Sequence, residues 1–462
     1  MQQSAGLRLF IGNRAFYRVT ASIVVPIIIQ NTVSNVVSLL DNVMVGQVGT
    51  LPMSAVAIIN QLMFVFNLCI FGGMAGPGIF STQYVGAGDQ EGVRACFRLK
   101  VWLGLFMFLA GAAVFTLLEE PLIRIYLTES GEDGALVMGY AKDYLAVMVL
   151  GLFPFAMTQA YAMTLRENGE TRLPMIASIC AILVNLVFNW LLIFGNLGFP
   201  VMGVKGAAIA TVMSRFVELG IIAVASHHRT ERFPFLKGAY RSLRVPVPLL
   251  KKVAVKGTPL LVNEFLWSSG LAAILACYST RGITPIAACN IASTVNNLFN
   301  VVFLSMGNAV SIMVGQALGA NDNEKAKDLA WKLMATGFLS SVVMGLLMLL
   351  AAPLIPQIYN TSEEVRTMAC SLLRVLAVFM PVFSIGHCCY FTLRAGGRTM
   401  ITFFFDCVFT WAGNYACALV LVTFTQLDVV AVYICVQCMD ILKDLLGIYL
   451  VHKGIWIRNI VA

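Results

Sequence analysis

Long apolar runs recur along this 462-residue chain and determine what it can fold into. Twelve of them are long enough to cross the hydrocarbon core of a bilayer as helices, which takes about 20 residues each. Hydrophobic residues make up 59% of the chain and charged residues only 12%. A soluble protein of this size has no interior large enough to hide that much apolar side chain. The sequence therefore predicts an all-α integral membrane protein with twelve transmembrane helices.

The two halves of the chain resemble each other. The segment Gln83–Asp89 matches Gln316–Asp322 at an offset of 233 residues, and Arg166–Thr171 matches Arg394–Thr399 at an offset of 228. Several landmarks at nearly constant offset indicate a duplication. Because each half holds six apolar runs, the copies have parallel topology and are expected to be related by a pseudo-two-fold axis along the membrane normal. We predict two six-helix lobes, an N-lobe at 1–226 and a C-lobe at 257–462, joined by a basic linker at 227–256.

The positive charges predict the orientation. Most of the 31 Lys and Arg residues fall in loops on the side that holds both termini and the 227–256 linker. The positive-inside rule places that side in the cytoplasm. We expect a multi-pass protein of the cell (inner or plasma) membrane. The net charge of +8 does not come with a basic stripe interleaved with aromatic residues, so nucleic-acid binding is not expected.

Asp41 is the most informative polar residue. The first apolar run carries Asn31, Ser34, Ser38 and Asp41 at spacings of 3, 4 and 3, which is one face of a helix. A charged carboxylate well inside a span costs about 2.5–3.5 kcal/mol on insertion scales. Burial therefore favours uptake of a proton or another cation at Asp41. The alternative is that Asp41 lies near the outer surface and stays hydrated.

Other polar residues follow the same helical spacing. Candidates to line a substrate cavity or take part in coupling are Gln30, Asn31, Asn263, Glu264, Asn290, Asn297 and Asp406. The amides have a structural alternative, since hydrogen bonds between helices hold membrane bundles together. Glu264 and Asp406 have the alternative of a paired structural charge or an interfacial position. Arg215 and Lys443 are interpreted as reaching toward lipid headgroups from near the ends of their spans.

Two prolines recur at matching positions inside spans. Pro26 in the first span corresponds to Pro259 in the seventh at the offset of 233. A proline removes a backbone hydrogen bond and weakens a helix locally. We expect these two spans to bend during the protein's working cycle.

The sequence resembles multidrug and toxic compound extrusion (MATE) transporters over nearly its whole length. The resemblance is carried by Pro26 with Asp41–Gly46, by the loops at Gln83–Gly88 and Gln316–Asn321, by Arg166–Gly169 and by Gly203–Thr211. It implies cation-driven antiport and export of cationic amphipathic compounds. By position, Asp41 resembles the residue that binds the coupling cation, and Asn185, Asn189 and Thr211 match polar positions nearby.

The resemblance is incomplete at Asn189. Some relatives carry Asp where this chain has Asn189, which puts the strength and identity of the bound ion in question. Glu264 resembles an acidic position on the seventh helix of other members. Na⁺ at Asp41, Asn185 and Asn189 is one candidate, and H⁺ is the other.

The predicted function is therefore a secondary antiporter rather than an enzyme. No Walker lysine motif is present, so ion gradients and not ATP are the expected energy source, and no cofactor is predicted. The expected partners are a small cationic substrate and membrane lipid, and the expected state is a monomer. A flippase for a lipid-linked precursor is the alternative, although only Arg215 and Lys443 are candidates to bind phosphates. An integral membrane enzyme is disfavoured because the four histidines are scattered.

Overall fold

A computed structural model describes residues 10–127, 131–359 and 361–462, and within these ranges every regular element is a helix. Ten helical segments are long and apolar enough to cross a membrane. They are α2 (Arg14–Gly46), α3 (Thr50–Ala87), α4 (Gln90–Leu117), α8 (Arg172–Phe194), α9 (Gly203–His228), α10 (Val247–Ser279), α11 (Ile283–Gly319), α12 (Asn323–Ala351), α13 (Glu363–Ala395) and the segment Thr399–Phe424, which comprises α14 (Thr399–Phe403), η4 (Phe404–Tyr415) and α15 (Ala416–Phe424).

Two further spans complete the predicted set. Helices α6 (Gly131–Leu150) and α7 (Leu152–Glu167) form one span with a bend of 43° between them. Helix α16 (Val429–His452) is 24 residues long and carries three charged residues, Asp440, Lys443 and Asp444, near its middle, more than the apolar stretches of the other ten segments hold. Each of the twelve apolar runs in the sequence is a helical span in the structure. The all-helical membrane fold is confirmed.

Short elements connect the spans. The connecting segments include α5 (Glu119–Tyr126), η1 (Asn196–Gly198) and η3 (Ile355–Ile358), and η2 (Pro234–Leu236) lies in the basic linker. Several helices begin at a capping side chain: Asp322 accepts a hydrogen bond from the Lys325 amide, and Ser362 accepts one from Val365. Such caps satisfy amide groups that the first helical turn leaves without a partner.

The chain divides into two compact units by its internal contacts. Unit 1 comprises residues up to Ile28, Thr82–Asp89 and Ala254–Ala462, and unit 2 comprises Ile29–Ser81 and Gln90–Val253. The boundary therefore passes through α2, α3 and α10. The two units differ from the chain halves, because the first turns of α2 and the end of α3 belong with the carboxy-terminal helices.

In unit 2 the basic linker is attached to α4. Arg94 Nε donates to the Phe235 carbonyl at 3.1 Å, Arg98 Nε donates to the Ala239 carbonyl at 2.8 Å, and Trp102 Nε1 donates to the Leu243 carbonyl at 2.9 Å. Their spacing of four residues places all three donors on one face of the helix. The linker is thus a fixed part of unit 2.

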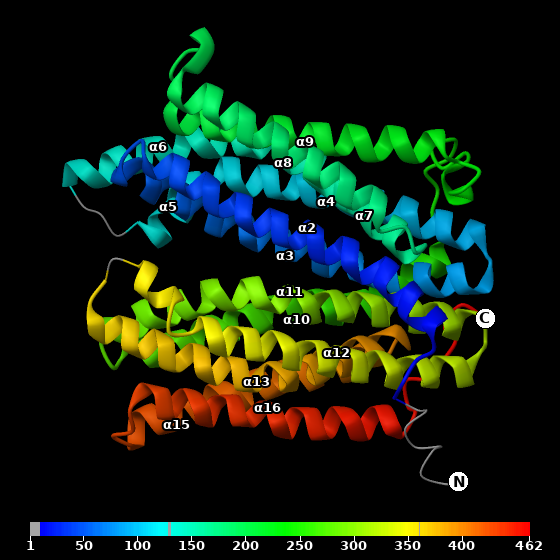
Figure 1. Cartoon of the computed structure of the whole chain (residues 1–462). Coiled ribbons are helices and arrows are strands. Elements are labelled where there is room, and N and C mark those ends of the chain that lie inside the picture. Colours follow the sequence, from blue (N-terminus) through cyan, green and yellow to red (C-terminus); the bar gives the residue numbers. More distant parts are fainter. Residues whose placement is uncertain (1–9, 128–130, 360) are drawn as a thin grey trace. The chain divides into compact units, whose positions relative to one another are not determined.

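Unit 2 also buries an ion pair. Lys100 on α4 is fully buried, and its Nζ lies 2.5 Å from Glu167 Oε2 and 3.1 Å from Thr164 Oγ1 on α7. Around it, α4 packs on α7, and α8 lies beside α9 (Figure 1). Removing one partner of a buried ion pair leaves a charge without compensation and costs about 3–5 kcal/mol.

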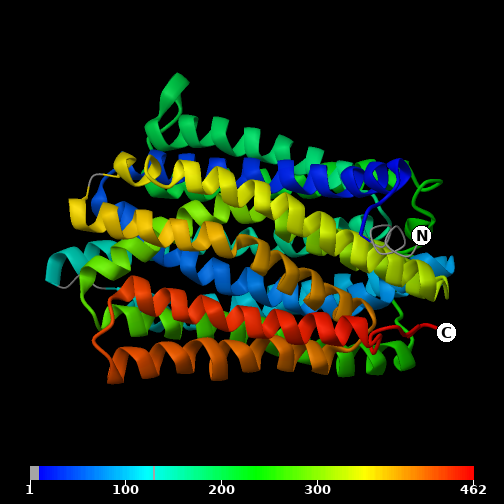
Figure 2. The same ribbon diagram turned by 60° about the horizontal axis from the view of Figure 1, so that its bottom comes forward.

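In unit 1, α13 is the central helix and packs against α11, α12 and α16 (Figure 1). Helix α16 runs beside η4 and α15 (Figure 2). The apolar core joins Ile23 and Ile27 of α2 to residues of α11, α12 and α13. This arrangement brings residues of η4 and α16 together although the sequence separates them by a loop.

The duplicated Gln-x-x-Gly segments cross each other in unit 1. A Cβ added to Gly86 would collide with the Gln316 carbonyl, and one added to Gly319 would collide with the Gln83 carbonyl. The contacts are reciprocal, as the repeat predicts, because Gly86 corresponds to Gly319 and Gln83 corresponds to Gln316 at the offset of 233. Gly88 and Asn321, also related by that offset, both have a positive φ, at 73° and 59°. The crossing requires glycine because two backbones touch there.

We predict that Gly86→Ala destabilises the protein by about 1–3 kcal/mol, the usual cost of overpacking. The measurement is the thermal unfolding midpoint in detergent. Gly220→Ala on α9 is the matched control, because a Cβ there meets nothing within 4 Å. Equal midpoints for the two variants would contradict the crossing.

We also predict that Lys100→Met lowers the unfolding midpoint strongly, with a cost of about 3–5 kcal/mol. Lys327→Met is the control, since Lys327 pairs with Glu324 on an exposed surface, where such pairs contribute about 0–1 kcal/mol. A loss of similar size in both variants would contradict a special role of the buried pair.

Candidate functional site

The site predicted around Asp41 is assembled in unit 2 from three helices. Asn189 Nδ2 on α8 donates to Asp41 Oδ1 on α2 at 2.7 Å. Asn185 lies one helical turn before Asn189, and its side chain contacts Thr211 Oγ1 on α9 at 3.2 Å. The two asparagines are buried, with Asn189 1% exposed, and Asp41 is half-buried. The structure therefore brings together all four residues that the resemblance singled out.

The Asn185 amide also faces Asp41. Its nitrogen donates to both oxygens of the Asp41 carboxylate, at 3.0 and 3.1 Å, and its oxygen accepts from Thr211 Oγ1 at 3.2 Å. Asp41 therefore receives hydrogen bonds from two amides on α8.

An acceptor without a donor also lies at this site. Asn189 Oδ1 is buried and has no hydrogen-bond partner among the residues that the structure describes. A buried polar atom left unsatisfied costs about 1–3 kcal/mol. A cation or a protonated carboxyl group near Asp41 would relieve that cost. Oxygen atoms of carboxylates and amides are the ligands that hard cations take.

The described residues contain no cluster of three or more His, Cys, Asp or Glu side chains that could hold a metal ion. A cation site at Asp41 would therefore depend on amide and hydroxyl oxygens beside a single carboxylate. This composition suits a monovalent ion or a proton better than a divalent metal.

Two other candidates on α2 lie elsewhere in unit 2. Gln30 Oε1 accepts a hydrogen bond from Arg166 Nη2 on α7 at 2.7 Å. Asn31 is half-buried beside it. Gln30 therefore holds a buried arginine rather than taking part in the Asp41 cluster.

Unit 1 contains a second polar cluster, centred on Asp406 of η4. Lys443 Nζ on α16 lies 2.6 Å from Asp406 Oδ1, and Asn263 Nδ2 on α10 donates to Asp406 Oδ2 at 3.1 Å. Asn263 also contacts the Tyr390 hydroxyl at 3.4 Å and accepts from Cys407 Sγ at 3.2 Å. Glu264 is partly buried next to Asn263. Both Asn263 and Asp406 are thus engaged with protein groups.

The structure contradicts the interpretation of Lys443 as a side chain that reaches toward lipid headgroups. Its side chain is only 16% exposed and forms an ion pair with a carboxylate on another helix, instead of reaching toward lipid headgroups. The sequence carried one signal for this pairing, the charged residues Asp440 and Asp444 on either side of Lys443. That signal did not identify Asp406 as the partner.

The structure also gives the local surroundings of three further candidates, Asp406, Asn290 and Asn297. Asp406 lies in a π-helical segment of 12 residues, so the side-chain spacing of an ordinary helix does not hold there. π-helical turns are common at functional sites. Asn290 and Asn297 are exposed on α11 rather than buried with Asp406.

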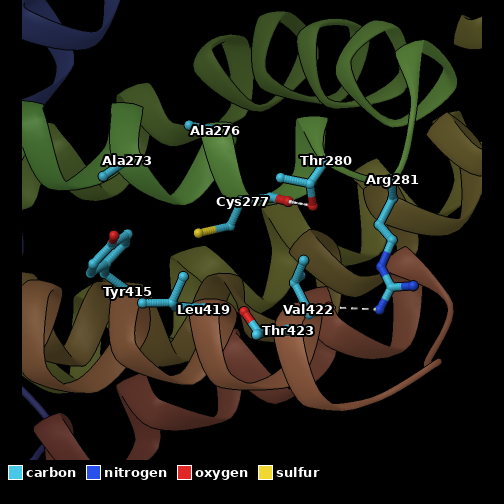
Figure 3. A pocket seen from close by; sticks show the side chains of 9 residues that line it. All are labelled: Ala273, Ala276, Cys277, Thr280, Arg281, Tyr415, Leu419, Val422 and Thr423. Atoms are coloured by element: carbon cyan, nitrogen blue, oxygen red, sulfur yellow. Dashed lines mark hydrogen bonds between the residues drawn. The ribbon is translucent and has the colours of Figure 1, made fainter.

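Unit 1 also contains a surface pocket. It has a volume of about 560 Å³ and lies between the end of α10 and α15, with Tyr415 at one end and Arg281 at the other (Figure 3). Arg281 Nη2 donates to the Val422 carbonyl at 3.0 Å. No predicted site residue lines this pocket, and its side chains are mostly apolar.

Comparisons with known proteins find three similarities. The family model described as MatE matches residues 26–191 and 259–412. The chain is 25% identical to "Probable multidrug resistance protein NorM" of Thermotoga maritima, covering 94% of this chain and 92% of that protein. It also resembles crystal structures of a MATE protein in the straight conformation (TM-score 0.85, 21% identity, 97% of this chain and 98% of that one) and in the bent conformation (TM-score 0.84, 21% identity, 95% of each chain).

Proposed function

The chain belongs to the MATE family of membrane transporters and is not an enzyme, and we propose that it exports cationic amphipathic compounds in exchange for H⁺ or Na⁺. The related NorM protein is named as a probable multidrug resistance protein, which supports drug-like small molecules as the substrates. The observation that carries the proposal is the cluster of Asp41, Asn185, Asn189 and Thr211.

The coupling cation binds at Asp41. A proton would convert the carboxylate into a donor for an amide oxygen, and Na⁺ would be shared between the carboxylate and the amide oxygens of Asn185 and Asn189. Binding of either cation requires the Asn185 amide to turn its oxygen toward Asp41, because without a cation its nitrogen donates to both carboxylate oxygens at 3.0 and 3.1 Å.

Cation binding is coupled to bending of α2. Pro26 lies inside α2 and removes a backbone hydrogen bond, which weakens the helix at that point. The boundary between the two contact units falls at Ile28, directly beyond Pro26. A change at Asp41 therefore acts on a helix that has a weak point between the units. Pro259, at the matching place in α10, gives the second span of this kind. A relative solved in bent and straight conformations supports this role.

The membrane potential supplies enough free energy to drive the proposed export. One charge crossing 100 mV is worth about 2.3 kcal/mol, which sustains a substrate gradient of roughly 50-fold at about 1.4 kcal/mol per decade. We further propose that both termini face the cytoplasm, since the basic linker and both termini lie on one side in the predicted topology. The protein acts as a monomer in the plasma membrane, with an N-lobe at 1–226 and a C-lobe at 257–462.

We predict that Asp41→Asn abolishes gradient-driven transport. The protein is reconstituted in liposomes, and accumulation of a fluorescent organic cation is followed while a pH gradient and a Na⁺ gradient are imposed separately. The variant is expected to lose at least about tenfold in accumulation, because a neutral amide no longer attracts the cation. Asp133→Asn, an exposed position on α6, is the control. Full coupling in Asp41→Asn would refute the site, and a wild-type protein inert under both gradients would favour the lipid flippase.

We predict that Asn189→Asp strengthens cation binding. The substitution places a second carboxylate where the Asn189 nitrogen now lies 2.7 Å from Asp41. A second negative charge within about 4 Å adds several kcal/mol of attraction at an effective dielectric constant of about 20. The ion concentration that half-saturates transport should fall at least about tenfold. An unchanged half-saturating concentration would argue against a cation at this place.

A further inference from the structure

The two polar clusters satisfy their carboxylates in different ways. Asp406 has one protein partner on each oxygen, the Lys443 ammonium at 2.6 Å and the Asn263 amide at 3.1 Å. Asp41 is bonded to an amide, and the described residues provide no ion-pair partner for it within 4 Å. One buried carboxylate therefore carries its own cation and the other does not.

The repeat shows that this pair is specific to unit 1. At the offset of 228, Lys443 corresponds to Arg215 and Asp406 corresponds to Ser178. Arg215 donates to the Gly151 carbonyl at 3.3 Å and lies over the Phe155 ring at 5.1 Å. Both units thus keep a basic residue at this place. Lys443 pairs with an acid on another helix, whereas the acid that interacts with Arg215 is Glu218, on the same helix.

The surroundings of Lys443 contain an excess of acids. Asp440 and Asp444 on α16 interact electrostatically with Lys443, and Glu264 on α10 and Arg394 and His387 on α13 belong to the same electrostatic network. Asp444 is 6% exposed, and its Oδ2 has no hydrogen-bond partner among the described residues. Four carboxylates therefore accompany two permanent cations. Without Lys443, this cluster would attract a free cation.

We propose that Lys443 is a tethered counter-ion that excludes the coupling ion from Asp406 and thereby fixes the number of ions exchanged per substrate at one. The ammonium occupies the position beside Asp406 Oδ1 that a free monovalent cation or a proton would take. A tethered group competes with a high effective concentration, because it is already held at the site. The inference rests on the proposed cation coupling at Asp41 and adds that Asp406 is not a second coupling site.

The test compares ion stoichiometry between variants. In liposomes with the membrane potential clamped at zero, the substrate gradient at steady state is measured against the imposed H⁺ or Na⁺ gradient. Each coupled ion allows about a tenfold substrate gradient per tenfold ion gradient. Under a tenfold ion gradient, the wild-type protein should build a substrate gradient of about tenfold, and Lys443→Met one of about a hundredfold. Lys443→Arg, which keeps the charge, should behave as wild type, and the double variant Lys443→Met with Asp406→Asn should return to about tenfold.

Two further measurements keep the outcome decisive if Lys443→Met transports poorly. Asp406→Asn alone should retain the wild-type stoichiometry, because Asp406 takes up no ion. Equilibrium binding of radioactive Na⁺, or proton uptake by the purified protein, should show one more ion bound by Lys443→Met than by wild type. An equal number in both proteins would overturn the inference, as would loss of coupling in Asp406→Asn. If wild type shows no coupling at all, the proposed antiport fails, while the difference of one bound ion still decides the role of Lys443.

Discussion

The cost of a charged carboxylate in a medium without water governs the organisation of this protein. Lipid offers no hydrogen bonds, so each buried acid must find its partners within the chain. The structure uses two solutions. Asp41 is held by amide groups of a neighbouring helix, and Asp406 is held by an ammonium and an amide. The first solution leaves a negative charge that an external cation is able to neutralise, and the second neutralises it internally.

The duplication supplies a common scaffold on which these solutions differ. The reciprocal contacts of Gly86 with Gln316 and of Gly319 with Gln83 are preserved because backbone contact tolerates no side chain. Polar positions are under no such steric limit. The repeat therefore places an acid at Asp406 where its counterpart is Ser178, and an apolar Ile274 where the counterpart is Asp41. Similar folds in the two halves do not imply similar chemistry.

This asymmetry suits an antiporter. A carrier that exchanges one substrate for one ion needs a single place where the ion binds and is released, coupled to a helix that changes shape. The Asp41 cluster and the proline in α2 meet that requirement within one helix. The ion pair of Lys443 with Asp406 places charged groups in unit 1. In the proposed scheme, this pair does not create a competing ion site. The linker attached to α4 and the buried Lys100–Glu167 pair supply rigidity within unit 2.

The sequence by itself determined the membrane class, the twelve spans and the duplication, and its family resemblance pointed to the residues of the Asp41 cluster. The length of apolar runs, the helical spacing of polar residues and the repeat offsets are all visible in the sequence, without knowledge of which helices touch. The tertiary structure alone decided that Lys443 pairs with Asp406, that Lys100 is buried against Glu167, and that the linker belongs to unit 2. Each of these depends on contacts between distant segments. The spacing of an ordinary α-helix also failed to predict which residues share a face in η4, because a π-helix changes the register there. A charged residue near the end of an apolar run fits either a lipid headgroup or a buried partner, and only the packing of neighbouring helices distinguishes the two.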